Sequence, residues 1–296
     1  MVFADRKQAG PINESGQPKL IWLYFPITMM LLSLHGTGYA QASSEEETVC
    51  GFLKERFYFN IWRKAAGKPD IRRVSGIPAI EAISFTTRDG RKLHGYKLRN
   101  SAVLPSPKGY ILVAQGNAML ADQIAGSLQF LARYGYDVYI YDYRGYGNSQ
   151  GNPRLKAILG DYREIASRLN AAGYPKKLLY GISFGGMVLL NCIGSGVTFD
   201  AAVIDSAPSR LSVYGCPEQY DSVTILPKEC SNLKIIVGEL DSVLAMNEME
   251  ELLITAQKRG AEVLRGSDYA HPFMDSPPVH ERRMQEVARF LFERAE

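Results

Sequence analysis

The sequence has almost no surplus of charge: 34 Lys and Arg residues face 31 Asp and Glu residues, a formal net charge of +3 over 296 residues. It shows no cluster of Lys or Arg of the kind that nucleic-acid-binding domains present, so we expect no nucleic-acid partner. The sequence also lacks C-x-x-C and H-E-x-x-H patterns. These absences give no reason to expect a metal site.

Near the amino terminus, one apolar run is too short to be an ordinary membrane span. Residues 20–34 contain 15 residues without a charge, follow basic residues, and precede the Ala-Gln-Ala of residues 40–42. A basic flank, a short apolar core and an A-x-A site are typical of a signal peptide, whereas a spanning helix needs about 20 residues. A buried strand is the alternative. We therefore expect 1–42 to be a signal peptide or N-terminal membrane anchor, and the protein to be exported. It would be periplasmic or secreted, with membrane contact expected only through residues 20–34 if this segment is uncleaved.

Cysteine is scarce, and all four cysteines follow this leader. An exported protein meets an oxidising compartment that permits disulfides. Cys216 and Cys230 lie in one irregular stretch, and the sequence leaves open whether they pair. A disulfide between them would stabilise the fold by about 3 kcal/mol in the chain-entropy model. Cys192 lies in an apolar helical run and is expected to be a buried free thiol. Cys50 follows Glu-Thr-Val, which is not a lipoprotein site, so no lipid attachment is expected there.

After the leader, the pattern predicts an N-terminal extension at 43–76, with a short helix near 50–62, and one domain at 77–296. Two strand-like runs at 79–87 and 92–99 are joined by Asp-Gly, a strong hairpin signal. Continuous apolar runs then alternate with helical patterns, which indicates parallel strands covered by helices on both faces. The expected strands lie at 109–116, 136–145, 176–183, 199–208, 232–241 and 261–271, making eight with the hairpin. Residues 209–232 have no clear period and are expected to form a short cap above the sheet.

Ser183 lies where one of these buried strands passes into a helix, in the sequence Gly-Ile-Ser-Phe-Gly. G-x-S-x-G at a strand-to-helix turn is the nucleophile elbow, in which a strained backbone exposes the serine hydroxyl. Glycines are needed there because the two backbones approach closely. The alternative is a glycine-rich connector with an incidental serine.

A nucleophilic serine needs a base, and the base needs an acid to orient it. Only four histidines are present. His271 is the one expected in a loop after a carboxyl-terminal strand, since the other three fall in the leader, the hairpin and the last helix. Asp241 follows another strand and is the first candidate for the acid, with Glu239 second; Asp241 could instead cap a turn or helix. The chain order Ser183, Asp241, His271 is that of α/β-hydrolases.

From about residue 77 onward, the chain resembles the α/β-hydrolase fold, in the branch of serine-aminopeptidase-like and monoacylglycerol-lipase-like hydrolases. The segment "YDYRGYGNSQGNP" is similar to that branch's D-x-R-G-x-G-x-S motif, and "GISFGG", "GELDSV" and "YAHPF" match its catalytic positions. The resemblance implies that the backbone N–H groups of Asn117 and Phe184 form the oxyanion hole. The chain departs from the family at Gln115, since His-Gly is usual in that loop.

Two classes of function follow. The first is a serine hydrolase acting on a small-molecule acyl substrate, cleaving an ester, thioester or amide with no metal or cofactor. The second is an exported, non-catalytic binding protein on the same scaffold. A dinucleotide-binding turn at "RGYGNSQG" is disfavoured because its third glycine is displaced and Asn152-Pro153 interrupts before the helix. The sequence does not indicate an oligomeric state.

Overall fold

The computed structural model describes residues 46–100 and 106–295, which belong to one compact unit, Ala42–Glu296. The leader expected at 1–42 lies outside the described residues. The helices are α1 (Phe52–Ala66), α2 (Ala121–Ala132), α3 (Leu155–Asn170), α4 (Phe184–Gly194), α5 (Ser222–Ile225), α6 (Met246–Lys258) and α7 (Pro277–Glu293), with 3-10 turns η2 (Ile71–Arg73), η3 (Ser212–Tyr214) and η4 (Glu218–Tyr220). The strands are β1 (Ile80–Thr86), β2 (Lys92–Leu98), β3 (Gly109–Ala114), β4 (Tyr136–Tyr141), β5 (Lys176–Ile182), β6 (Ala201–Asp205), β7 (Leu233–Gly238) and β8 (Glu262–Gly266).

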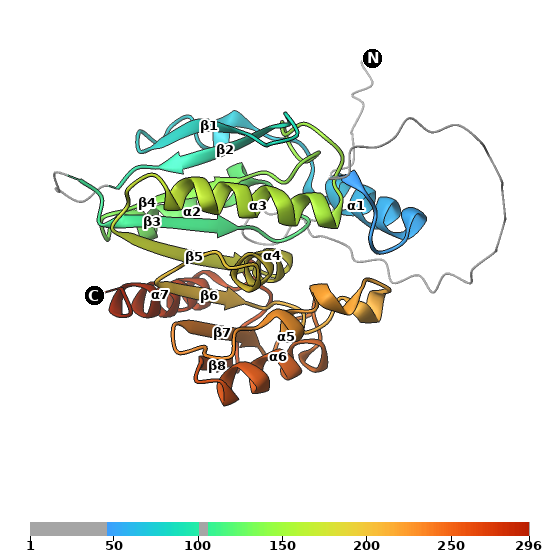
Figure 1. The fold of residues 1–296 in the computed structure, drawn as a ribbon. Helices are drawn as coiled ribbons and strands as arrows, with labels where there is room; N and C mark the ends of the chain where they lie inside the picture. Colours follow the sequence, from blue (N-terminus) through green and yellow to red (C-terminus); the bar gives the residue numbers. More distant parts are fainter. Residues whose placement is uncertain (1–45, 101–105, 296) are drawn as a thin grey trace, which may run out of the picture. The chain divides into compact units, whose positions relative to one another are not determined.

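All eight strands form one sheet in the order β1-β2-β4-β3-β5-β6-β7-β8 (Figure 1). The hairpin β1–β2 pairs antiparallel, β2 pairs antiparallel with β4, and every later pairing is parallel. The expected eight-stranded, mostly parallel sheet is therefore confirmed. Its parallel strands all present their carboxyl ends at one edge, which is where α/β proteins build their sites.

Helices cover both faces of the sheet because its central strands are apolar on both sides. In β3, Tyr110 and Leu112 belong to one buried cluster, whereas Ile111 and Val113 belong to another. Successive side chains of a strand point to opposite faces, so the two clusters lie on the two sides of the sheet. The first cluster includes side chains of α1, α3, α4 and α6, and the second those of α2 and α7. Strands β3, β4, β6 and β7 are buried along their whole length, and β5 is buried from Leu178 to Ile182, after two partly buried lysines.

The disulfide joins Cys50 to Cys216, so the pairing of Cys216 with Cys230 that the sequence left open does not form. The two bridged residues are 166 positions apart, yet their Cα atoms lie 4.0 Å from each other. They meet because the extension brings the start of α1 against the segment between β6 and β7. Cys230 is instead a buried free thiol whose Sγ lies 3.2 Å from the Pro227 carbonyl oxygen. Cys192 is buried and free, as predicted.

The segment between β6 and β7 contains only short turns and the four-residue α5. Asp221 organises it: the carboxylate accepts hydrogen bonds from the backbone N–H groups of Leu211 and Ser212 and from the Ser212 hydroxyl. We keep the name cap for residues 209–232. Among the described helices, none combines the length and apolar character that crossing a bilayer requires.

Candidate functional site

Ser183 occupies the turn between β5 and α4, with φ 54° and ψ −120°. Positive φ is strained for a residue with a Cβ, and it is found in only three non-glycine residues of the described chain. The turn is held from both sides, because the Ser183 N–H donates to the Asp205 carbonyl at 2.7 Å and the Gly186 N–H donates to the Ser183 carbonyl at 2.9 Å. The serine side chain therefore stands at the amino end of α4, at the carboxyl edge of the sheet.

The neighbouring glycines are required by close backbone approaches. A Cβ on Gly185 would lie 2.0 Å from the Ala114 carbonyl oxygen, and one on Gly181 would lie 2.5 Å from the Gly186 Cα. Neither gap could hold a methyl group, since the obstructing atoms are backbone. The glycines thus allow α4 to start directly against β3 and β5, which is the sharp bend that the sequence motif predicts.

Asp241 and His271 are brought together by the loops that follow β7 and β8. The Nδ1 atom of His271 lies 2.8 Å from Oδ2 of Asp241, and both side chains are largely buried. The other oxygen, Oδ1, accepts hydrogen bonds from the backbone N–H groups of Val243 and Leu244. Burial raises the pKa of Asp241, but the hydrogen bond and charge of His271 and these two N–H groups outweigh it, so the pKa lies below its ordinary value. A carboxylate held in this way accepts the Nδ1 proton and leaves Nε2 free to act as a base.

Glu239, the second candidate for the acid, is exposed. Of the remaining histidines, His94 lies in β2 and His280 in α7.

A buried arginine, Arg283 of α7, holds the loop that carries His271. Its Nη2 donates to the Ala270 carbonyl at 2.6 Å, its Nε lies 3.0 Å from an Asp275 oxygen, and its Nη1 lies 3.2 Å from Asp205. Asp275 in turn accepts from the Ala270 N–H at 2.7 Å. Burial raises the pKa of Asp205, with Arg283 acting against that rise. The sequence did not predict this network. The position of Asp205 at the end of a buried strand was the one signal for it.

The loop after β3 adjoins Ser183. A Cβ on Gly116 would lie 3.7 Å from the Ser183 Cβ, so the backbone of this loop passes next to the serine. Gln115, the position that departs from the family pattern, is fully buried and donates from Nε2 to Asp142 at 3.3 Å and to the Met119 carbonyl at 3.2 Å. Asn117 is oriented by Tyr146, whose hydroxyl donates to its side-chain oxygen.

The D-x-R-G-x-G-x-S segment supports this loop and the neighbouring strands. Asp142 accepts a hydrogen bond from the Ala121 N–H at the start of α2 at 2.7 Å, and burial raises its pKa to about 6. Arg144 is buried and pairs with Asp161 and Asp89. Asp142 and Arg144 therefore make contacts within the protein itself, and the segment connects α2, α3 and the β1–β2 hairpin.

Aromatic side chains cover the serine turn from the side of α1. The Phe184 ring meets Phe59 of α1 edge to face at 5.9 Å and Tyr143 at 5.5 Å between centroids. The N-terminal extension therefore reaches Phe184, the residue directly after Ser183, and the disulfide ties it to the cap. Sequence reasoning treated the cap alone as the cover of the site.

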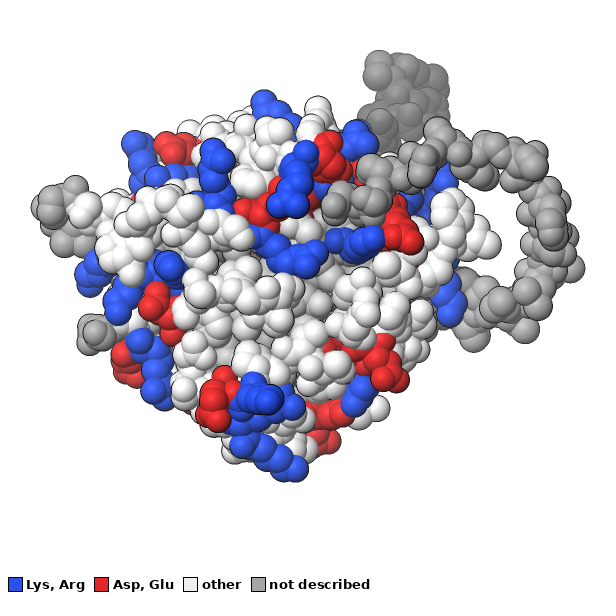
Figure 2. Space-filling view, in the orientation of Figure 1, with Lys and Arg blue, Asp and Glu red and all other residues white. Residues whose placement is uncertain are grey.

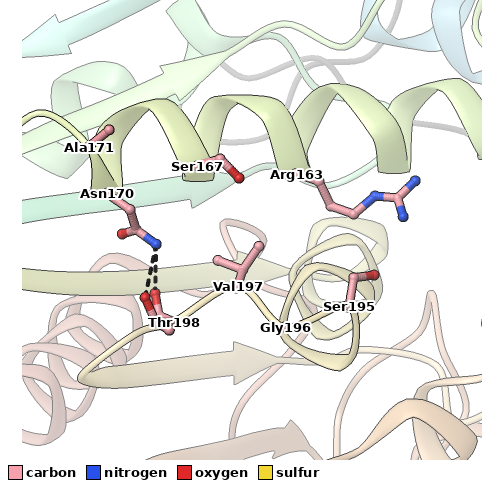
Figure 3. Close-up of a pocket in the computed structure, with 8 residues that line it drawn as sticks. All are labelled: Arg163, Ser167, Asn170, Ala171, Ser195, Gly196, Val197 and Thr198. Carbon is pink, nitrogen blue, oxygen red and sulfur yellow. Dashed lines mark hydrogen bonds between the residues drawn. The ribbon is translucent and has the colours of Figure 1, made fainter.

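In the described part of the chain, no group of three or more His, Cys, Asp or Glu side chains could hold a metal ion. A pocket of about 500 Å³ lies between α3 and the segment after α4 (Figure 3). It is lined by Arg163, Ser167, Asn170, Ala171, Ser195, Gly196, Val197 and Thr198. On one side of it, the Asn170 Nδ2 atom donates two hydrogen bonds to Thr198, one to the carbonyl oxygen and one to the hydroxyl. This pocket is at the carboxyl end of α4, whereas Ser183 is at its amino end, so it is no part of the candidate site.

Several known proteins resemble this chain. The Rv2307c protein of Mycobacterium tuberculosis is 30% identical over 239 residues, covering 75% of this chain and 82% of that protein. The YfhR protein of Escherichia coli is 27% identical over 202 residues, covering 61% and 69%. Both are described as uncharacterized.

Among solved structures, the Pyrococcus furiosus esterase Pf2001 matches with a TM-score of 0.62 at 17% identity, covering 78% of this chain and 98% of that one. Brefeldin A esterase, described as a bacterial homologue of human hormone sensitive lipase, matches with a TM-score of 0.58 at 13% identity, covering 82% and 85%. At these identities the two matches bear on the fold alone. The family described as serine aminopeptidase, S33, matches residues 105–263, more than half of the sequence. The chain therefore belongs to this family of hydrolases in the α/β-hydrolase superfamily.

Proposed function

We propose that the protein is a serine hydrolase that cleaves a carboxylic ester or related acyl bond, with Ser183 as nucleophile, His271 as base and Asp241 as the orienting acid. The observation that carries the proposal is the 2.8 Å hydrogen bond between His271 and Asp241 at the sheet edge where Ser183 stands in its strained turn. A histidine fixed by a buried carboxylate is the base that a nucleophilic serine needs for acyl transfer.

In this mechanism His271 Nε2 removes the proton of Ser183 as Oγ attacks the carbonyl carbon. Asp241 holds the imidazole in the tautomer that makes Nε2 the acceptor and stabilises the imidazolium. The backbone N–H groups of Phe184 and Asn117 are proposed to receive the oxyanion, and the amino end of α4 favours the same negative charge. His271 then gives its proton to the leaving group. Water attacks the acyl-enzyme with His271 again as base, releasing the acid and restoring Ser183.

We favour an ester over an amide substrate. The fold neighbours include esterases, whereas the family description names an aminopeptidase. Phe59 and Phe184 are aromatic, and Val223 and Leu226 of the cap belong to the same buried apolar cluster, which suits a small or medium apolar acyl group. Hydrolysis of p-nitrophenyl esters of increasing acyl length, compared with aminoacyl p-nitroanilides, tests this choice. Faster turnover of the anilides would assign a peptidase instead.

We also propose that the protein is exported. Its Cys50–Cys216 disulfide is a bond that persists in the periplasm or outside the cell and is rare in the cytosol. Fractionation of cells with detection of the oxidised chain tests this proposal, and recovery of only reduced protein in the cytosol would refute it.

A fluorophosphonate probe tests the nucleophile directly. Wild-type protein and the Ser195→Ala variant should be labelled, whereas Ser183→Ala should not, because the probe reacts with an activated serine. The His271→Ala variant should keep its fold and lose turnover by orders of magnitude. Labelling that persists in Ser183→Ala would remove this serine from the role of nucleophile and favour the binding-protein alternative.

A further inference from the structure

The side of α1 that faces away from the sheet is apolar. Leu53, Phe57 and Ile61 are 78%, 49% and 45% exposed, and residues four apart on a helix share a face. Phe52 and Tyr58 extend the exposed apolar surface on either side. The inward side is buried through other residues of the same helix. Helix α1 thus has two apolar sides, of which only one is used by the fold.

The charges on the outward side of α1 are all positive. Lys54, Arg56, Arg63 and Lys64 are exposed. The one carboxylate of the helix, Glu55, is buried and accepts hydrogen bonds from three backbone N–H groups, those of Val49, Cys50 and Leu155. At the α1 end of the molecule, Figure 2 shows Lys and Arg among uncharged residues, together with some Asp and Glu atoms. The outward side of α1 therefore exposes apolar and basic side chains.

The cap continues this surface. The disulfide holds Cys216 against the start of α1, and the Lys54 Nζ atom lies 3.1 Å from where a Gly215 Cβ would be. The preceding residues, Val213 and Tyr214, are 69% and 43% exposed. We call the side chains of Phe52, Leu53, Phe57, Tyr58, Ile61, Val213 and Tyr214 the α1 face.

We propose that the α1 face docks on an anionic membrane surface. Helices that lie in the membrane interface combine Phe, Leu and Trp with Lys and Arg in this way, burying the apolar side chains among the lipids while the cations meet anionic headgroups. A second observation comes from the chain outside the described residues. Seventeen residues separate the end of the apolar run 20–34 from Phe52. A fully extended segment of this length spans at most about 60 Å. If that run is in a membrane, α1 is within reach of the same surface.

Docking in this orientation would have a consequence for the site. Since Phe59 on the inward side of α1 touches Phe184, the serine turn would lie just beneath the membrane-facing helix. Membrane docking itself does not depend on the proposed chemistry, so a Ser183→Ala protein should dock as well as wild type. Failure of the hydrolase proposal and failure of docking are therefore separate results.

The experiment places a polarity-sensitive NBD label on the α1 face of the full chain as an Ile61→Cys variant. Cys50 and Cys216 are in the disulfide, and Cys192 and Cys230 are buried, so the introduced thiol is the one that reacts. Label emission is measured with phosphatidylcholine vesicles and with vesicles that also contain phosphatidylglycerol. The readout is local, so attachment of the chain by residues 20–34 does not itself produce it. A label at Tyr134→Cys, an exposed position between α2 and β4, is the control.

The label at residue 61 should brighten and shift to the blue with the anionic vesicles, and the label at residue 134 should not. A Leu53→Ser/Phe57→Ser change should abolish the response, whereas Ile254→Ser, which removes an exposed apolar residue of α6, should leave it intact. Lys54→Gln/Lys64→Gln should weaken binding to anionic vesicles by roughly tenfold or more. An unchanged label at residue 61, or equal responses at 61 and 134, would overturn the proposal and assign the face to another occupant. Equal binding to both vesicle types would overturn the role of the cations.

Discussion

The imidazole of His271 and the carboxylate of Asp241 come from loops after adjacent parallel strands, β8 and β7, and are joined by a hydrogen bond between Nδ1 and Oδ2. Two backbone N–H groups fix the other carboxylate oxygen. The carboxylate is therefore held in one orientation, and the Nε2 atom of the imidazole ring points away from Asp241.

The first prediction concerns this pair. Replacing Asp241→Asn should reduce kcat by about 10³- to 10⁴-fold, because an asparagine that presents its NH₂ to Nδ1 favours the wrong tautomer. Steady-state hydrolysis of a p-nitrophenyl ester measures the loss. The matched control is Glu239→Gln, which changes an exposed carboxylate two residues earlier and should leave kcat unchanged. If the control loses activity and Asp241→Asn keeps it, the acid is Glu239.

The second prediction concerns the disulfide. A Cys50→Ser/Cys216→Ser protein should unfold at a lower temperature, since closing a loop of about 166 residues stabilises by about 5 kcal/mol in the chain-entropy model. Dithiothreitol should lower the melting temperature of wild type and not that of the double variant. Cys230→Ser is the control. Because this change removes a free thiol and leaves the disulfide intact, the melting temperature should remain sensitive to dithiothreitol. Loss of that sensitivity in Cys230→Ser would mean that Cys230 is bridged.

The third prediction concerns the protonation of Asp142. Its pKa is raised to about 6 by burial, from an ordinary value of 3.8. Between these values the folded protein binds the proton more tightly than the unfolded chain, so the free energy of unfolding falls as the pH rises through this window. Above about pH 6, where Asp142 is ionised in the folded protein as well, the loss of stability is nearly complete. Because the pKa is raised by about two units, this loss amounts to about 3 kcal/mol.

Comparison with Asp142→Asn isolates this effect, since the asparagine does not titrate. Urea denaturation at several pH values should show wild type losing about 3 kcal/mol of stability relative to the variant between about pH 4 and pH 7.

For Asp241, the stability of the fold should depend on pH in the opposite direction. The pKa of Asp241 is lowered, so its carboxylate stabilises the fold above its ordinary pKa and this stabilisation is lost as the pH falls through the lowered value. A difference between wild type and Asp142→Asn that does not change with pH would contradict the raised pKa.

The sequence predicted the sheet because the signals for it are local. Continuous apolar runs such as Gly109–Ala114 mark strands that are buried on both faces, and the glycines around Ser183 mark a turn that no larger residue could make. The positions of Asp241 and His271 at strand ends followed from the same reasoning. Such features depend on residues within about ten positions of each other.

Features that depend on distant contacts were not predicted. The sequence left open whether Cys216 pairs with its neighbour Cys230 and did not indicate Cys50 as the partner, because nothing local shows that Cys50 arrives from 166 residues away. The role of α1 as a cover of the site was missed for the same reason, since the contact of Phe59 with Phe184 joins the extension to the middle of the chain. Arg283 was also missed, because an arginine within a helix pattern gives no sign of being buried.

The last prediction concerns Arg283, which we regard as a positioning residue for His271. Removing its charge would leave the buried carboxylates of Asp205 and Asp275 without the cation that they share, a change that typically costs several kcal/mol and endangers the fold. Arg283→Lys keeps the charge and loses the fork that reaches the Ala270 carbonyl, Asp275 and Asp205 together.

The Arg283→Lys protein should fold, lose at least tenfold in kcat with little change in KM, and show a shifted acidic limb in its pH–rate profile, because the loop holding the base is displaced. Arg282→Lys, at an exposed neighbour that pairs with Asp268, is the control and should retain wild-type kinetics. A purely structural role for Arg283 would lower the melting temperature and leave kcat and the pH profile of the folded fraction as in wild type. That result would exclude it from positioning the base.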